Sequence, residues 1–355
     1  MKFKIKKWSF AIASVALLSC GLASCNDDWT EEQYEQYISF KAPLDKEGNS
    51  VGVTTVYVPF TRVDENGNPK YGTEGLSHYQ LPVIVSGSTD NNRDRTAHVA
   101  HSDTLDILNV ERFGSNRPEL WYVDMSQYAS YPETVFIPAG QNEALLNVSL
   151  DFRNIDLSDR YVLPIQVITN EADGCIRNPR KNYGQAMLRI LPYTDFSGMF
   201  QAANVKFQVV SGGVTDDEPG AMSTIQTYTV AQNKVFFYAG TFDESSQIRK
   251  NFKVYATFTP TTEEGDRGTV LLECENPLMN FKQNKLGSYV IVEQPDEVQS
   301  YIMRRTLIIS DIDYNFDDYL TAPGSVISYN ISGNMTMERK LNTQMPEEDQ
   351  IIFDY

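Results

Sequence analysis

Histidine and aspartate side chains gather in a short stretch of the chain at His98, His101 and Asp103. A strand here would put His101 and Asp103 on one face and His98 on the other, because alternate residues of a strand face opposite sides. Two side chains fall short of the three protein ligands that a catalytic zinc ion needs. We therefore predict exposed strand residues here, with no metal bound.

A second stretch alternates polar and apolar residues at Asp311, Asp313, Asn315 and Asp317. On a strand these side chains line one face and would present a row of oxygen atoms to Ca²⁺. The spacing resembles the start of an EF-hand loop, but Phe316 stands where that loop requires Gly for its sharp turn. An EF-hand is thereby excluded. A solvated acidic face is favoured, and Ca²⁺ binding near Asp311 and Asp313 is left open.

Sequence signatures of familiar enzymes are absent. The chain holds no Gly-x-Ser-x-Gly elbow, no phosphate-binding Gly-Lys-Ser/Thr loop and no His-Glu-x-x-His. Its 47 acidic residues leave open a carboxylate pair of the kind that hydrolyses glycosides. The interpretation is a protein with no catalytic residues and no cofactor, with a glycoside hydrolase as the weaker alternative.

Sugar binding needs flat aromatic faces and polar side chains, and the chain has 20 Tyr and 18 Phe. Trp121 and Tyr122 are neighbours, so a strand would expose one and bury the other, in an order left open. The other candidates flank a polar loop or the acidic row. The full candidate set for ligand binding is Trp121, Tyr122, Phe281, Tyr289, Tyr314 and Tyr319. Core packing is the more frequent role for any one aromatic ring.

Cys25 closes the tetrapeptide Leu22-Ala23-Ser24-Cys25, behind four lysines and an apolar run over residues 8–22. The run is too short for a stable transmembrane helix. The three features in this order predict a lipoprotein signal peptide at residues 1–24, lipidation of Cys25 and a tether at 25–35. Cleavage before Cys20 is the weaker alternative.

The charge and the cysteine content narrow the possible class of protein further. The net charge is −17, and it becomes −21 once residues 1–24 and their four lysines are removed, which makes nucleic acid an unsuitable partner. Only Cys175 and Cys274 remain after processing, too few for a disulfide framework or a Cys-based zinc site. Two buried thiols are favoured, and one bridge between them is left open.

The segments that must position these residues have strand character throughout, and a short helix is expected only at residues 30–37. The first series of predicted strands covers residues 54–61, 79–85, 119–123, 134–137, 144–150, 161–168 and 186–191. The second covers residues 199–210, 224–230, 234–238, 252–258, 269–273, 288–292, 305–312 and 325–338. The patterning pauses over residues 192–198, so the sequence predicts an all-β chain with domains at residues 36–193 and 194–355.

Residues 135–141 (VFIPAGQ), 147–151 (NVSLD) and 161–167 (YVLPIQV) resemble a pattern of Bacteroidota surface lipoproteins. That pattern marks an immunoglobulin-like N-terminal β-sandwich of unassigned function. Residues 329–339 (YNISGNMTMER) resemble the closing strand of lipocalin-like antiparallel β-barrels or sandwiches in the same class. Residues 26–28 (NDD) resemble the acidic signal that sends such lipoproteins to the extracellular side of the outer membrane.

The resemblance implies a protein of the polysaccharide-utilisation type, similar to the accessory glycan-binding lipoproteins of starch-utilisation systems. Its partners would be a glycan or polysaccharide, the outer membrane through the lipid anchor, and an outer-membrane transporter complex. The expected function is glycan capture for uptake without catalysis. A structural or adhesive role with a protein partner is the alternative.

Overall fold

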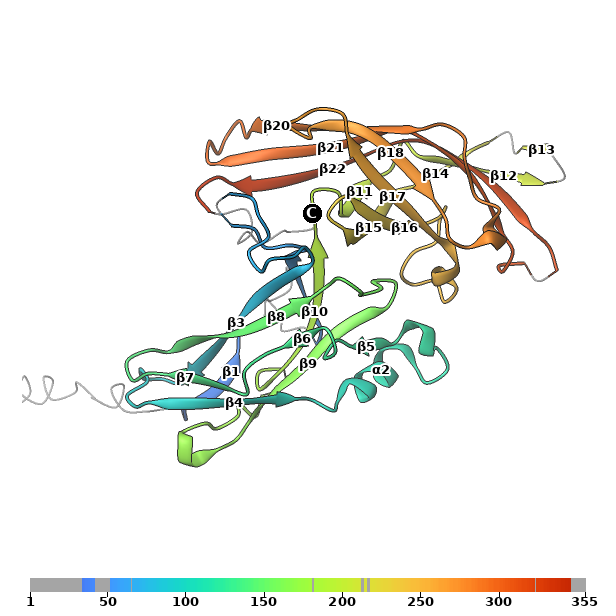
Figure 1. Cartoon of the computed structure of the whole chain (residues 1–355). Helices are drawn as coiled ribbons and strands as arrows, with labels where there is room; N and C mark the ends of the chain where they lie inside the picture. Colours follow the sequence, from blue (N-terminus) through green and yellow to red (C-terminus); the bar gives the residue numbers. More distant parts are fainter. Residues whose placement is uncertain are drawn as a thin grey trace, which may run out of the picture.

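The computed structural model describes residues 34–41, 52–64, 66–180, 182–211, 214–215, 218–322 and 324–345. Among these residues the chain is nearly all β, with one α-helix, α2 (Leu105–Phe113) (Figure 1). No helix in the described part has the length and apolar character needed to cross a membrane. The predicted lipidation site Cys25, its signal peptide and the tether up to residue 33 lie outside the described residues. The all-β prediction is confirmed.

Two β-sheets form the N-terminal half. The strands of the first are, in spatial order, β1 (Tyr37–Phe40), β3 (Leu76–Ser86), β8 (Glu143–Asp151) and β6 (Ala129–Ser130). Those of the second are β2 (Thr54–Pro59), β10 (Gln185–Tyr193), β9 (Arg160–Ile168), β4 (Arg95–His101) and β7 (Thr134–Ile137), and β5 (Tyr122–Asp124) also pairs with β9. Alternate residues of both sheets, such as Leu81 and Leu163, are fully buried in one shared core. The two sheets therefore form a β-sandwich.

One strand pair of the sandwich positions the site described below. β2 lies at the edge of its sheet and pairs in parallel with β10. Val56 and Ile190 lie opposite each other in this pair and point into the sandwich core. Their neighbours along each strand therefore face away from the sandwich core.

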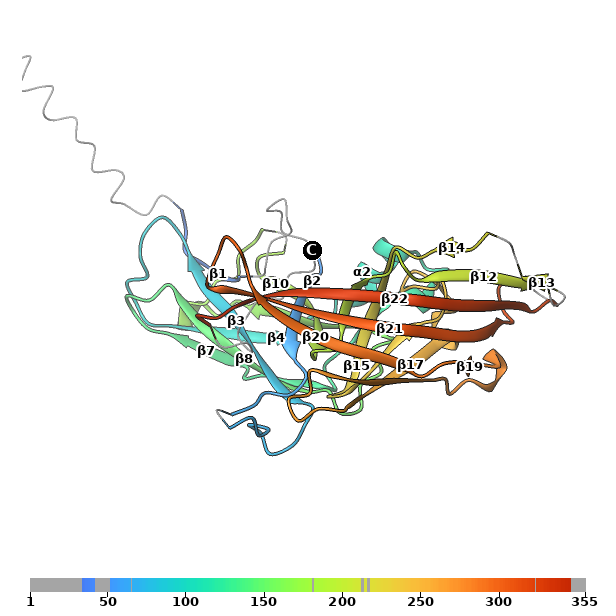
Figure 2. The same ribbon diagram turned by 90° about the horizontal axis from the view of Figure 1, so that it is seen from above.

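The C-terminal half is a closed barrel of eight strands. Around the barrel they are β11 (Gly198–Gln201), β15 (Thr224–Ala231), β16 (Lys234–Tyr238), β17 (Lys253–Pro260), β18 (Arg267–Glu273), β20 (Gly287–Pro295), β21 (Ile302–Asp318) and β22 (Ile327–Asn342). β22 pairs with both β21 and β11, which closes the ring and removes free sheet edges. Figure 2 shows the long strands β20, β21 and β22 running side by side along the barrel.

Four short or peripheral strands extend the barrel sheet. They are β12 (Lys206–Ser211), β13 (Val214–Thr215), β14 (Gly220–Ala221) and β19 (Lys282–Gln283). β12 pairs with the first part of β22 and carries β13 and β14, whereas β19 pairs with β21. The barrel interior is rich in aromatic rings, including the fully buried Phe200, Phe252 and Phe258. The sequence thus builds a filled barrel.

The chain changes from one half to the other over four residues. β10 ends at Tyr193 in the sandwich, and β11 begins at Gly198 in the barrel. Between them, the Ser197 backbone amide and the Ser197 hydroxyl both donate to the Thr194 carbonyl. We retain residues 36–193 and 194–355 as the proposed domain bounds.

The helical expectation was wrong in two respects. In the described part of the expected helix at residues 30–37, residues 34–36 are not helical and Tyr37 begins β1. Instead α2 packs Leu105 against the outer face of the sandwich, where Val162 and Met187 lie. The buried Asn109 side chain bonds both to the backbone amide and to the carbonyl of Tyr122. Tertiary contacts of this kind have no signature in a local sequence pattern.

Candidate ligand-binding cleft

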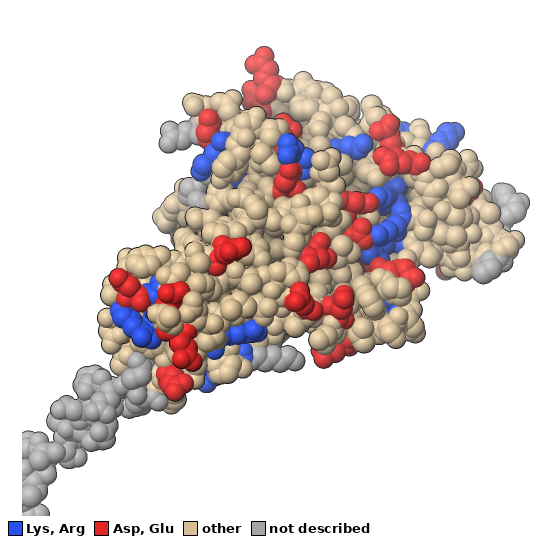
Figure 3. Space-filling model, turned by 60° about the horizontal axis from the view of Figure 1, so that its bottom comes forward, with Lys and Arg blue, Asp and Glu red and all other residues tan. Residues whose placement is uncertain are grey.

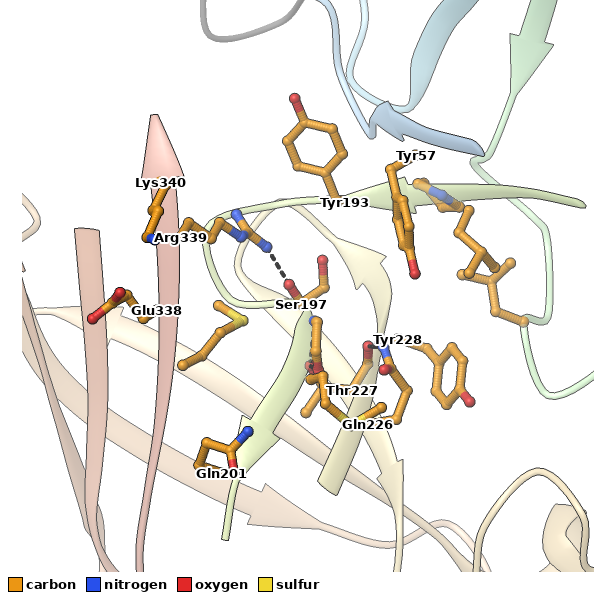
Figure 4. A pocket seen from close by; sticks show the side chains of 16 residues that line it. Tyr57, Tyr193, Ser197, Gln201, Gln226, Thr227, Tyr228, Glu338, Arg339 and Lys340 are labelled. Carbon is orange, nitrogen blue, oxygen red and sulfur yellow. Dashed lines mark hydrogen bonds between the residues drawn. The ribbon is translucent and has the colours of Figure 1, made fainter. Parts of the chain in front are cut away.

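A cleft separates the outer face of the sandwich from the outer face of the barrel. It consists of two adjoining cavities of about 310 Å³ and 690 Å³. Both are lined by Tyr57, Leu191, Met199, Gln226 and Tyr228, so they are continuous. Figure 4 shows the smaller cavity with its lining side chains. Cavities of this size suit small-molecule or oligomeric ligands.

The sandwich contributes side chains from β2 and β10. In their parallel register Thr55 lies beside Arg189, and Tyr57 lies beside Leu191. All four line the larger cavity, and Tyr57 and Leu191 also line the smaller one. The alternation of buried and accessible residues thus places a hydroxyl, a guanidinium and an aromatic ring along one wall.

The barrel contributes the opposite wall from β11 and β15. Met199 lies opposite Gln226, and Gln201 lies opposite Thr224. Phe200, between the two β11 residues, is fully buried in the barrel core. Figure 4 shows Gln201 and Gln226 projecting from this wall. Their amides offer both donors and acceptors to a ligand rich in hydroxyl groups.

The smaller cavity ends at a basic side chain of β22. The guanidinium of Arg339 lies 5.4 Å from the centre of the Tyr193 ring, and its Nη2 donates to the Ser197 carbonyl (Figure 4). Glu338, from the same strand, pairs with Arg304 at 2.8 Å. Arg339 is thus held in place by the turn that joins the two halves.

The larger cavity contains a partly buried ion cluster. Glu244 Oε1 accepts a hydrogen bond from Arg189 Nη2, and its backbone carbonyl accepts one from Arg160 Nη2. Burial raises the pKa of Glu244, but Arg189, a hydrogen bond from Tyr228 and Arg160 together hold it below its usual value. Glu244 is therefore an ionised partner of both arginines and is poorly suited to act as a general acid.

The two halves are locked together beside the cleft. Arg249 is only 1% exposed, and from the barrel side it donates to the carbonyls of Glu119 (2.8 Å) and Ser158 (3.2 Å). Two further ion pairs cross the boundary, Lys250–Asp159 and Lys253–Asp156. Leu157 packs among Tyr228, Phe236, Tyr238 and Tyr255 of the barrel. We call Arg249 and these two ion pairs the interdomain clamp.

The six aromatic candidates from the sequence do not line this cleft. Tyr122, Tyr289 and Tyr314 are at most 7% exposed, so for these three the expectation of ligand-accessible faces is wrong. Tyr122 packs against Phe113 with ring centres 5.2 Å apart. Tyr289 packs against Phe258. Core burial takes up both faces of such rings.

The other three candidates are partly accessible, but each is engaged by its own half of the protein. Phe281 packs against Tyr314 with ring centres 5.3 Å apart. The Tyr319 hydroxyl accepts a hydrogen bond from the Asn276 side chain. Trp121 follows the 3₁₀ turn Pro118–Leu120, where a strand was predicted, and its indole donates to the Gly114 carbonyl. Of the neighbouring pair, Trp121 is therefore the accessible member and Tyr122 the buried one.

The two histidines of the first stretch each pair with aspartate side chains. His101 lies between Asp124 (2.6 Å) and Asp103 (3.1 Å), and His98 pairs with Asp173. No group of three or more His, Cys, Asp or Glu residues within the described ranges has metal-binding geometry.

In the acidic row the Asn284 side chain donates to both Asp313 and Asn315. Lys285 pairs with Asp311 at 2.7 Å. Asp311 has a φ of 61° at a bulge in β21, so it departs from the regular alternation of the row.

The two cysteines are free thiols in different halves. Cys175 is buried in the sandwich core, and its sulfur donates to the Ile168 carbonyl. Cys274 lies beside Met279 in the barrel. The structure thus contradicts the disulfide that the sequence left open, and both residues pack as small hydrophobic side chains.

The cleft residues were missed because they come from distant parts of the chain. Tyr57, Arg189, Tyr228 and Arg339 lie on four different strands. Alternation alone identifies Tyr57 and Arg189 as outward-facing residues. It does not reveal that a second domain faces them.

Sandwich, closed barrel and interdomain cleft together define a class of two-domain all-β proteins. A family model described as a domain of unknown function (DUF4973) matches residues 29–172. A second model, described as "-like, C-terminal", matches residues 184–336. A comparison with curated proteins gives no match.

Solved structures give close matches. One, described as an auxiliary nutrient binding protein from Bacteroides thetaiotaomicron, is 38% identical, with 88% of this chain and 99% of that chain covered and a TM-score of 0.79. A Bacteroides ovatus protein of unknown function is 36% identical, with 89% and 99% covered and a TM-score of 0.74. A multidomain protein including DUF1735, also from Bacteroides ovatus, is 34% identical, with the same coverage and TM-score. The chain belongs to the family of these Bacteroides proteins.

Proposed function

We propose that this protein is a cell-surface lipoprotein that binds glycan in the cleft between its domains and performs no catalysis. Lipid on Cys25 would hold it on the extracellular side of the outer membrane, beside the transporter complex that imports the ligand. The name of the relative from Bacteroides thetaiotaomicron, an auxiliary nutrient binding protein, supports the binding role.

The cleft carries the proposal. Its walls combine the ring of Tyr57, the amides of Gln201 and Gln226 and the guanidinium of Arg339. An aromatic face covers the apolar C–H surface of a sugar, whereas amides and guanidinium groups bond its hydroxyls. Three carboxylates line the cleft: Glu244 and Glu338 are each paired with arginine, and Asp243 accepts hydrogen bonds from Ser245. The two arginine-paired carboxylates fit binding better than hydrolysis.

Affinity electrophoresis of residues 26–355 against a broad polysaccharide panel tests the proposal. Tyr57→Ala should weaken the affinity for the bound polysaccharide about tenfold, as truncating a central aromatic contact does. Reduced retardation in the gel measures this loss. Tyr183→Ala is the matched control, because Tyr183 is 38% exposed and lies outside the cleft. It should leave retardation unchanged.

The panel also separates the competing functions. Flat curves with every polysaccharide would overturn glycan binding, and co-purification with a protein partner would then favour the adhesive role. Release of reducing sugar from any member would identify a hydrolase. For the anchor, Cys25→Ser should move the protein from the membrane fraction to the soluble fraction, and retention in the membrane would refute lipidation of this residue.

A further inference from the structure

Three arginines meet one carboxylate at the larger cavity. Arg160 and Arg189 both line the cavity and both bond to Glu244. Arg249 lies behind them, in the interdomain clamp, and its hydrogen bonds go to backbone carbonyls. The cluster therefore carries three positive charges against Glu244, and the second carboxylate that lines the cavity, Asp243, is bonded to Ser245.

This excess charge is poorly solvated. The side chains of Arg160 and Arg189 are 11% and 18% exposed. Burial lowers the pKa of Arg160, Glu244 raises it, and the charges of Arg249 and Arg189 lower it further, so that it lies below its usual value. At Arg189 burial also lowers the pKa, but Glu244 outweighs burial and raises it, so the uncompensated charge is that of Arg160. Buried charge is costly unless opposite charge accompanies it. A ligand that brings negative charge into the cavity would supply that compensation.

Arg189 has a donor to spare. Within the described residues it forms one hydrogen bond, from Nη2 to Glu244; its Nε is buried without a partner, and its Nη1 forms no hydrogen bond. Arg160 donates through Nη1 to the Leu120 carbonyl and through Nη2 to Glu244, and its Nε also lacks a hydrogen bond within the described part of the chain. Guanidinium donors bind carboxylate and sulfate oxygens in pairs.

The surroundings make the cluster unusual for this chain. The protein as a whole has a net charge of −17, and acidic side chains are spread over its surface. Figure 3 shows basic side chains gathered in the hollow between the two halves, bordered by acidic ones. A neutral glycan would gain only hydrogen bonds from this arrangement, whereas an acidic one would also gain Coulombic attraction.

We infer that the larger cavity takes an acidic group of the ligand, the carboxylate of a uronic acid or a sulfate ester, against Arg189 and Arg160. This inference rests on the proposed function, because it specifies the class of glycan that the cleft binds. Tyr228, whose hydroxyl bonds Glu244, and the outward-facing Thr55 line the same cavity.

The experiment uses residues 26–355 and pairs each acidic polysaccharide with a neutral counterpart of the same backbone. Polygalacturonic acid is compared with its methyl ester for the carboxylate, and dextran sulfate with dextran for the sulfate. Alginate is compared with its carboxyl-reduced form, and chondroitin sulfate with a form that is both desulfated and carboxyl-reduced. Retardation in affinity electrophoresis is measured at low and at high salt. We expect at least one acidic member to bind tenfold or more tightly than its counterpart, and salt to weaken that binding.

Two variants with opposite expected signs separate a ligand site from a purely structural ion cluster. Arg189→Gln should weaken binding of the acidic member roughly tenfold or more. Glu244→Gln keeps the acceptor for Arg189 but removes the competing negative charge, so it should strengthen that binding. A structural cluster would give no gain with Glu244→Gln. Arg267→Gln is the control, because Arg267 is 61% exposed and paired with Asp266 outside the cleft.

Each outcome decides between the two proposals. Preference for acidic polysaccharides supports the inference if Arg189→Gln weakens their binding and Glu244→Gln strengthens it. Equal binding of acidic and neutral members overturns it and leaves glycan binding intact. Acidic binding that both variants leave unchanged also overturns it, because the charge then acts elsewhere. Absence of binding to every member overturns both proposals. Thermal melting of each variant shows whether a loss of binding reflects unfolding.

Discussion

Replacement of Arg249 by Met tests whether the two domains are held together by the interdomain clamp. Arg249 is 1% exposed and donates to the carbonyls of Glu119, Ser158 and Ser246. Methionine fills a similar volume but donates no hydrogen bond. The three carbonyls would then lose a charged donor in a buried position, at about 1–3 kcal/mol for each one left unsatisfied.

Relief of the repulsion between Arg249 and Arg160 offsets part of this loss. We therefore expect the free energy of unfolding to fall by about 2–4 kcal/mol, less than the sum of the three separate losses. Urea denaturation followed by tryptophan fluorescence measures it, and Trp121 is well placed because it lies two residues from Glu119. Arg267→Met, at an exposed ion pair, is the matched control and should change little. Equal shifts in the two variants would refute the clamp.

Three further predictions concern other parts of the fold. Burial lowers the pKa of His101, but Asp124 and Asp103 outweigh it and raise the pKa above its usual value. The stabilisation that His101 provides is therefore complete below its unfolded pKa of about 6.5 and is lost as the pH rises through the folded value. The difference in melting temperature between wild type and His101→Gln should thus shrink from pH 5.5 to pH 8.5. A constant difference would contradict the pH-dependent stabilisation by His101. In Gly268→Ala the new Cβ would meet the Thr259 carbonyl oxygen at 2.1 Å, which should destabilise the barrel by about 1–3 kcal/mol. Gly52→Ala, whose nearest neighbour is Leu108 Cδ1 at 3.9 Å, should cost little, and similar urea midpoints for the two would refute the steric argument. Burial raises the pKa of the Cys175 thiol, so in a Cys274→Ser variant of residues 26–355 it should react with Ellman's reagent only after unfolding, and fast reaction of that native variant would contradict the burial of Cys175.

The barrel strand β21 shows which of its residues alternation correctly predicts to be accessible and which to be buried. The sequence placed Asp313, Asn315 and Asp317 on one solvated face, and their side chains are partly accessible. The same alternation puts Tyr314 on the opposite face, where it is buried. Nearness in sequence to the acidic residues favours Tyr314 as a ligand candidate, and the structure contradicts it. The period of two was the stronger signal.

The cleft shows what local patterns do not predict. Alternation on β2 separates the buried Val56 from the outward-facing Tyr57, but an outward-facing residue is normally in contact with water. Tyr57 lies in a cleft only because β15 and β22 of the barrel stand opposite it. That placement depends on Arg249 and two lysines that reach backbone and carboxylate groups about 90 to 130 residues away in sequence. Such long-range contacts leave no periodic trace.

The interdomain clamp also bears on how the cleft binds. Its ion pairs and the buried Arg249 join the domains before any ligand is present, so the cleft walls are already in position. A preformed site spends little of its interaction energy on ordering itself. In the proposed binding mode, the few polar groups of the two walls would hold the glycan, and the ion cluster at Arg189 would select among glycans by charge. Arg249 does not line either cavity. Weaker glycan binding in the folded Arg249→Met variant would therefore show that the fixed angle between the domains contributes to affinity.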